Sequence, residues 1–292
     1  MTTAAATGFL NRLQLFSGEI RVQESIFALP FAYTGMVLAA DGGPTWSQFV
    51  WVTVAMVSAR TLGMSANRII DRHIDLRNPR TSGRHLASGR LRTPEMVALS
   101  AIAAVVFFVA AAMLNTLAFS LAPVAAAYLV IYPFAKRYVW VASFLLGWAL
   151  AIAPSAAWIG VRGSLSWEPV LLSTAVALWA ASFDILYHAQ DFDFYTNSGL
   201  HSVARKFGVR AAFRIARALD VLSVACLAWV GVGLSLAWPY YVGCAVAAAV
   251  LMYKHSMVSP EDLSRMGVAF FRINAYVSLT VFAATMVAVF VI

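Results

Sequence analysis

SQFVWVTVAMVSARTLGMSANRIIDRHID, residues 47–75, joins two kinds of sequence without a break. Residues 47–66 are largely apolar and carry one charge, Arg60, whereas residues 67–75 carry an amide and two carboxylates. About 20 consecutive apolar residues in a helix cross the core of a bilayer. The first part therefore predicts a membrane-spanning helix, and the second predicts a polar extension of that helix at one membrane surface.

The rest of the chain repeats the apolar pattern. Of its 292 residues, 61% are hydrophobic and 12% are charged, about half the charged share of a soluble domain. We expect an all-α polytopic membrane protein with one integral domain over residues 1–292. A weak break near Asn115 leaves eight helices as an alternative to nine. The nine expected helices are 20–41, 47–66, 93–114, 116–135, 138–161, 167–190, 209–234, 237–255 and 267–291.

The distribution of basic residues predicts the orientation. If the N-terminus is cytoplasmic, the inner segments, of which 67–92 and 191–208 are the longest, hold nearly all the loop lysines and arginines. The outer loops then hold only Arg162. Cytoplasmic loops of membrane proteins are enriched in Lys and Arg. Topology and anionic ligands therefore explain the net charge of +8 better than nucleic acid, which we do not expect as a partner.

The first long inner segment begins with an acidic cluster. Asn67, Asp71 and Asp75 are spaced at i, i+4 and i+8, so they share one face of a helix. Arg60 lies one to two turns earlier, deeper in the same predicted helix, and we expect it to act at the same site. Each of these groups is costly inside a membrane, which favours a functional role.

The second cluster lies in FDILYHAQDFDFY, residues 183–195. Asp184, Tyr187 and Asp191 are spaced at i, i+3 and i+7, again on one helical face, and Asp193 follows. Asp184 is expected within the membrane depth of the sixth helix. The acidic motifs at 67–75 and 184–195 recur about 120 residues apart, which weakly suggests an old internal duplication.

The chemistry of the two clusters points to one site. Carboxylate and amide oxygens suit Mg²⁺, which often completes its coordination with phosphate oxygens, while nearby arginines bind the same anion. We therefore expect carboxylates to hold metal, and metal and arginines to hold a diphosphate. Two alternatives stay open. The charges are a solvated loop of paired Asp and Arg, or, less favoured, they line the path of a cation transporter.

Several segments resemble the UbiA superfamily of intramembrane prenyltransferases. NRIIDRHIDLRNPRT resembles its first aspartate motif, NDxxDxxxD, and DILYHAQDFDFY resembles the second, DxxYxxxDxxxD. YPFAKRY, residues 132–138, resembles the YPxxKR segment. FALPFAY, NPRTSGRHLASGRL and GLHSVARKFG are similar to the 4-hydroxybenzoate-polyprenyltransferase-like enzymes of menaquinone synthesis by the futalosine route.

The resemblance implies nine transmembrane helices around a central cavity in the bacterial inner membrane, with the active site on the cytoplasmic side. It implies Mg²⁺-dependent transfer of a polyprenyl group from polyprenyl diphosphate to an aromatic acid, of the 1,4-dihydroxy-6-naphthoate or 4-hydroxybenzoate type, in quinone synthesis. The alternative is another reaction of the superfamily, with a different acceptor or with terpene cyclisation. The implied metal ligands are Asn67, Asp71, Asp75, Asp191 and Asp193. The resemblance places Asp184 and Tyr187 near the acceptor, and Lys136 and Arg137 at the diphosphate or the acceptor carboxylate. We also expect Arg60 and Arg72 to bind the diphosphate and Tyr132 to lie near the acceptor.

One position departs from the second motif. Tyr195 stands where that motif usually ends in aspartate. Of the two Mg²⁺ ions that the resemblance implies, the second is therefore expected to be weak or absent. Asp193 replaces the missing ligand only if the chain is not helical there.

Overall fold

The computed structural model describes residues 2–22, 25–40 and 43–291, and they form an all-α protein. Each of the nine helices expected from hydropathy corresponds to a helix in these residues. They are α2 (Ser25–Ala39), α3 (Trp46–Arg77), α4 (Thr93–Leu114), α5 (Thr116–Ile131), α6 (Ala142–Arg162), α7 (Trp167–Ala189), α10 (Val209–Gly233), α11 (Trp238–Met257) and α13 (Asn274–Phe290). The additional helices are α1 (Thr2–Glu19) and the short helices η2 (Tyr132–Arg137), α8 (Phe192–Asn197), α9 (Val203–Phe207), α12 (Met266–Val268) and η3 (Ala269–Ile273).

Seven helical segments among the described residues are long and apolar enough to cross a membrane. They comprise α3, α4, α5 with η2, α6, α7, α10 and a segment from Phe271 to Phe290 that contains α13. The apolar part of α2 is shorter, from Leu29 to Ala39. The polytopic helical class predicted from the sequence is thus confirmed.

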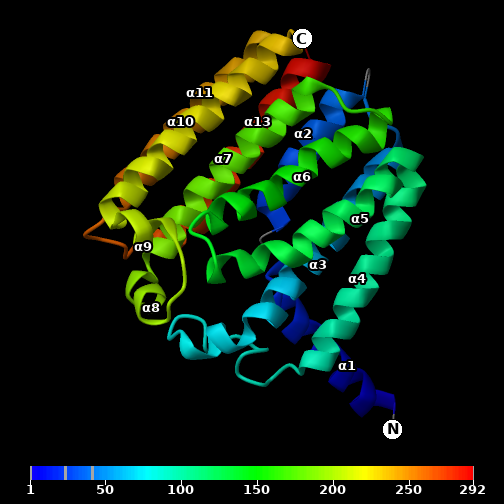
Figure 1. Ribbon diagram of the computed structural model, residues 1–292. Helices are drawn as coiled ribbons and strands as arrows, with labels where there is room; N and C mark the ends of the chain where they lie inside the picture. The colour runs from blue at the N-terminus through cyan, green and yellow to red at the C-terminus, as the bar shows by residue number, and fades with distance from the viewer. Residues whose placement is uncertain (1, 23–24, 41–42, 292) are drawn as a thin grey trace.

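The helices form two groups that share α2 and α6. In the first group, each helix contacts the next in the order α2, α6, α7, α10, α11 and α13, and α13 contacts α2, so the group forms a closed ring. In the second, α3 contacts α2, α4 and α5, and α5 contacts α6. Figure 1 shows α1, α8 and the segment 78–92 at one end of the bundle and the C-terminus at the other.

Two glycines allow the helices around α6 to approach closely. A Cβ atom on Gly35 of α2 would lie 2.3 Å from the carbonyl oxygen of Pro154 in α6. A Cβ atom on Gly147 of α6 would lie 2.3 Å from the carbonyl oxygen of Ala177 in α7. Small residues allow this backbone contact between membrane helices, so α6 is fixed between its two neighbours.

The limits of α3 are encoded locally. At its start, the Thr45 side chain accepts a hydrogen bond from the Gln48 amide, and the Gln48 side chain accepts one from the Thr45 amide. This reciprocal capping satisfies two backbone donors. At its end, Asn78 is extended because it precedes Pro79, which disfavours helical conformation at the preceding residue. The helix therefore runs unbroken through the first acidic cluster.

Candidate active site

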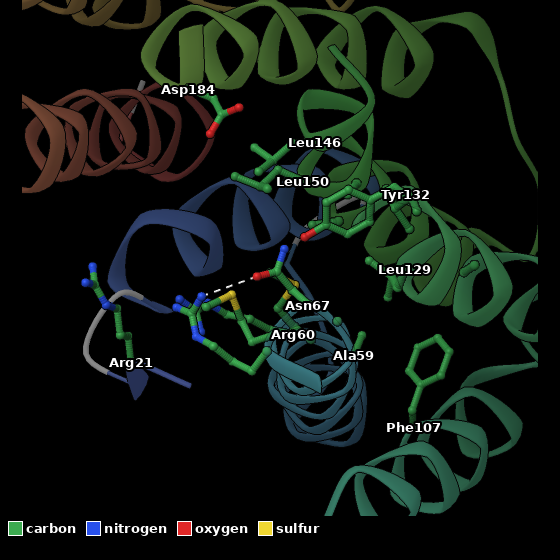
Figure 2. Close-up of a pocket in the computed structure, with 18 of the residues that line it drawn as sticks. Arg21, Ala59, Arg60, Asn67, Phe107, Leu129, Tyr132, Leu146, Leu150 and Asp184 are labelled. Carbon is green, nitrogen blue, oxygen red and sulfur yellow. Dashed lines mark hydrogen bonds between the residues drawn. The ribbon is translucent and has the colours of Figure 1, made fainter. Parts of the chain in front are cut away.

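A cavity of about 460 Å³ lies inside the bundle, within the usual range of roughly 300–1,000 Å³ for small-molecule sites. Its apolar wall includes Ala59, Phe107, Leu129 and Leu150, from α3, α4, α5 and α6 (Figure 2). Most of its polar side chains come from α3, η2, α7, the residues that follow α7, and the segment 78–92. One cavity therefore joins a long apolar compartment to a charged one.

The first acidic cluster lies on the cavity face of α3. Asn67, Asp71 and Asp75 all line the cavity, as their spacing predicted. The two carboxylates are 1% and 5% exposed. Figure 2 shows the Asn67 amide and the hydroxyl of Tyr132, at the start of η2, turned toward one another. The amide, the phenol and the carboxylates thus share one polar surface.

Asp71 is paired with two cations of η2. Lys136 Nζ hydrogen-bonds to Asp71 Oδ2, and Arg137 Nη2 lies 3.2 Å from Asp71 Oδ1. Arg137 also donates to the carbonyl of Ile70 at 2.7 Å. Lys136 is part of the cavity lining, whereas Arg137 supports Asp71 from behind the lining. Lys136 and Arg137, two of the basic residues expected to bind diphosphate, therefore lie at the first acidic cluster.

The second acidic cluster faces the first from α7. Asp184 is 5% exposed and lines the cavity, and its Oδ2 atom lies 3.1 Å from His188 Nδ1. His188 Nδ1 is also 3.3 Å from the hydroxyl of Ser143 in α6. Tyr187 lines the same cavity. The structure thus brings the sixth predicted helix and the first motif to one site, as expected.

Asp191, just beyond α7, is held by Arg80 of the segment 78–92. Arg80 Nε donates to Asp191 Oδ1 at 2.9 Å, and Nη2 donates to Oδ2. The guanidinium also contacts Tyr187, by a hydrogen bond to the hydroxyl and with Cζ 4.5 Å from the ring centroid. Burial would raise the pKa of Asp191, but the hydrogen bond and charge of Arg80 outweigh it and lower that pKa.

Asp75 and Asn67 also have basic neighbours. Arg84 Nη1 donates to Asp75 Oδ2 at 2.6 Å, and Arg68 Nη1 donates to Asn67 Oδ1 at 3.3 Å, the dashed line in Figure 2. The carboxylates of Asp71, Asp75 and Asp191 are therefore each paired with a cation. Opposite charges at this cavity therefore neutralise one another.

Besides Arg137, two of the expected site residues do not reach the cavity. Asp193 is exposed on α8, because the helical turn from 192 to 197 directs Asp191 and Tyr195 inward and Asp193 outward. The condition for Asp193 to replace a metal ligand is therefore not met. Arg72 instead donates to the Thr93 hydroxyl at 2.9 Å, since it lies on a different face of α3 from Asp71.

The cavity lining also includes residues that sequence reasoning did not assign, among them Arg68, Arg80, Arg84, His188 and Tyr195. The arginines belong to the basic run after Asp75, which the sequence shows but whose individual targets it does not. His188 is one turn after Asp184, a spacing that could have indicated the contact. Tyr195 is 4% exposed, so it fills the position of the missing aspartate with a phenol.

The donor set fits Mg²⁺ in its chemistry. Asn67, Asp71, Asp75 and Asp191 offer amide and carboxylate oxygens to one cavity, and Mg²⁺ takes few protein ligands when phosphate supplies the others. The buried Asp71 Oδ1 accepts no hydrogen bond from the described residues, although Arg137 is near it. Within the described chain, no three His, Cys, Asp or Glu residues are close enough to hold a metal as they stand.

Comparisons with known proteins agree with this geometry. A protein named 4-hydroxybenzoate octaprenyltransferase from Cupriavidus necator is 33% identical over 285 residues, which cover 96% of this chain and 98% of that one. A protein of the same name from Marinobacter nauticus is 36% identical over 230 residues, 78% of each chain. These two relatives are thus similar to most of the chain.

Solved structures of similar fold come from archaea. A UbiA homologue from Aeropyrum pernix, solved in its apo state, has a TM-score of 0.83 and 31% identity, covering 91% of this chain and 98% of its own. A UbiA homologue from Archaeoglobus fulgidus, solved with DMAPP and Mg²⁺, has a TM-score of 0.66 at 19% identity, covering 91% of this chain and 98% of its own. The second likeness concerns the fold alone. The model of the UbiA prenyltransferase family matches residues 28–289, so this chain belongs to that family and is an integral membrane prenyltransferase.

Proposed function

We propose that the protein transfers a polyprenyl group from polyprenyl diphosphate to an aromatic acid of the 4-hydroxybenzoate or 1,4-dihydroxy-6-naphthoate type, in quinone synthesis. The observation that carries this proposal is the junction of an apolar compartment with a surface of paired carboxylates and cations. A polyprenyl diphosphate likewise joins an apolar tail to a charged head. The relatives named 4-hydroxybenzoate octaprenyltransferase support the acceptor class.

The diphosphate replaces the carboxylates as the binding partner of the cations in the site. Lys136, Arg80 and Arg84 turn from their carboxylates to the phosphate oxygens, because guanidinium and ammonium groups bind phosphate strongly. Arg60, which also lines the cavity, adds a positive charge from α3. The prenyl tail lies along the apolar wall that includes Phe107 and Leu129, where burial removes its surface from water.

The carboxylates that these cations release are the proposed metal ligands. Asn67, Asp71 and Asp75 hold one Mg²⁺, and Asp191 contributes to a second, weaker site beside Tyr195. Bound Mg²⁺ supplies charge stabilisation to the departing diphosphate, as metals do in phosphoryl chemistry. A UbiA homologue from Archaeoglobus fulgidus was solved with DMAPP and Mg²⁺, which supports the choice of Mg²⁺ as the metal.

The acceptor is placed between the diphosphate and α7. Asp184 accepts a hydrogen bond from the acceptor hydroxyl and makes the ring more electron-rich, while Tyr187 and Tyr132 border the ring. As the allylic C–O bond breaks, its electrons leave with the diphosphate, a ring carbon forms the new C–C bond, and the ring then loses its proton to the released diphosphate. The apolar wall of the cavity limits the access of water to the allylic carbon.

The proposed topology has nine transmembrane helices around the cavity. In it, α2 and α11 cross the membrane with the seven longer apolar segments. The N-terminus and the acidic clusters face the cytoplasm, since the inner segments carry nearly all the loop lysines and arginines. The enzyme then belongs to the bacterial inner membrane, where its lipid donor resides.

An acceptor panel tests the proposal. The purified protein is incubated with Mg²⁺, radiolabelled polyprenyl diphosphates of several lengths, and either 4-hydroxybenzoate or 1,4-dihydroxy-6-naphthoate. The expected result is a labelled lipid that forms only when one of these acids is present. A labelled product that forms equally without any acid indicates cyclisation and contradicts the proposal. Asp71→Ala serves as the inactive control.

A further inference from the structure

The end of α1 bears a buried carboxylate outside the motifs. Glu19 is 4% exposed, and its Oε2 atom accepts hydrogen bonds from the amides of His85 at 2.7 Å and Leu86 at 3.3 Å. Its Oε1 atom lies 3.7 Å from Arg68 Nε. A buried carboxylate is stable only when such partners satisfy it. Glu19 therefore joins α1 to both α3 and the segment 78–92.

The backbone at the same point holds two arginines of the cavity. The carbonyl of Glu19 accepts from Arg68 Nε at 3.1 Å, and the carbonyl of Ile20 accepts from Arg60 Nη1 at 3.1 Å. The last carbonyls of a helix lack partners within the helix and carry partial negative charge. Arg60 and Arg68 both line the cavity, so the end of α1 fixes the direction of two cationic groups there.

The segment 78–92 is held from the same side. Its Arg84 reaches Asp75 at 2.6 Å and directly precedes His85, whose amide donates to Glu19. An apolar contact accompanies this link, in which Phe16 and Ile20 pack with buried side chains of the segment and of α4. Displacement of α1 would therefore shift Arg84.

We propose that Glu19 is a positioning residue for the diphosphate end of the donor. It holds the segment that bears Arg80 and Arg84 in a fixed relation to Arg60 and Arg68, and its negative charge offsets the repulsion among these arginines. This inference rests on the proposed function, because it assigns the diphosphate to the cavity. It predicts an effect on donor binding that is separate from the binding of the acceptor.

The test compares Glu19→Ala and Glu19→Gln with the wild-type protein and with Glu261→Gln, a matched control in an exposed pair with Arg210. Three quantities are measured: kcat with the KM of each substrate, hydrogen exchange of the His85 and Leu86 amides, and the concentration of inorganic pyrophosphate with Mg²⁺ that half-maximally stabilises the protein against heat. The last two do not depend on turnover.

We expect Glu19→Ala to raise the donor KM and the pyrophosphate midpoint by about tenfold and to change the acceptor KM by less than about twofold. The two amides exchange faster in this variant. Glu19→Gln retains an oxygen that accepts from both amides, so the hydrogen exchange of these amides stays near the wild-type rate. The donor KM of Glu19→Gln lies between those of the wild-type protein and of Glu19→Ala. If Glu19→Ala does not fold, the donor KM of Glu19→Gln decides the test.

Unchanged donor KM and pyrophosphate midpoint in both variants would overturn the inference. Equal changes in kcat and in both KM values would also overturn it, because they indicate only a general loss of structure. If the wild-type protein transfers no prenyl group at all, the proposed function fails. The exchange and pyrophosphate measurements then still decide whether Glu19 positions an anion site.

Discussion

Arg80 and Asp191, which are 111 residues apart in the sequence, form a two-point ion pair at the charged end of the cavity. This pair joins the segment after α3 to the segment after α7. It also places the Arg80 guanidinium over the ring of Tyr187. The segment after Asp75 is therefore connected to the second motif through Arg80.

The first prediction concerns the pH dependence of this pair. The pKa of Asp191 is lowered in the folded protein from an ordinary value of about 3.9. The stabilisation is therefore fully present above the ordinary pKa and is lost as the pH falls through the lowered value. We expect Arg80→Ala to lower the melting temperature at pH 7, and this difference should shrink below about pH 4. A difference that is constant across this range would contradict the assignment.

The second prediction concerns Asp71. Asp71→Asn removes the charge that Lys136 and Arg137 face and removes a proposed metal ligand. We expect turnover to fall by about 100-fold or more, a typical loss when one charge-stabilising group is removed from an active site. Initial rates at saturating substrate measure this loss, with the yield of folded protein in detergent unchanged. Asp193→Asn is the matched control, since its side chain is exposed, and it should remain within about twofold of wild type.

The third prediction concerns Tyr195. Burial raises the pKa of Tyr195 well above its ordinary value, so its hydroxyl is neutral at physiological pH and offers no anionic oxygen to a metal. Tyr195→Asp should therefore lower the Mg²⁺ concentration that gives half-maximal activity. Tyr195→Phe should leave that concentration unchanged. If Tyr195→Asp also has no effect on it, another group already supplies the second site.

The fourth prediction concerns a buried ion pair away from the cavity. Lys254 of α11 is 1% exposed, and its Nζ atom lies 2.6 Å from Asp220 Oδ2 in α10, which His255 Nε2 also approaches at 2.7 Å. Removal of one partner from such a buried group costs about 3–5 kcal/mol, whereas replacement of the whole group by apolar residues is often neutral. Thermal unfolding should therefore show a large loss for Lys254→Met and a recovery when Asp220→Leu and His255→Leu are added to it. A triple variant no more stable than Lys254→Met would refute this explanation.

The nine helical segments could be predicted from the sequence because hydropathy is a local property. The face shared by Asn67, Asp71 and Asp75 could be predicted because the helical period relates residues within one unbroken helix. The same reasoning did not yield α1, because its composition lacks a long apolar run. Its role became visible only through the contacts that Glu19 makes with residues more than 40 positions away.

The pairing of the charges was not predictable for a different reason. Five arginines lie between residues 68 and 84, and the sequence does not tell which of them reaches which carboxylate. The direction of the Asp193 side chain was not predictable either. The direction depends on how the short helix α8 is oriented relative to α7, and tertiary contacts determine that orientation. Tertiary structure fixes these relations, and only the residue types were evident beforehand.

The most direct test of the central claim is the stoichiometry of the reaction. Purified protein is given Mg²⁺, a polyprenyl diphosphate and 4-hydroxybenzoate or 1,4-dihydroxy-6-naphthoate, and both products are quantified by mass spectrometry and a pyrophosphate assay. The account predicts one molecule of ring-prenylated acid for each pyrophosphate released, and neither product in Asp71→Ala. Release of pyrophosphate with either acid present but without prenylated acid would contradict it.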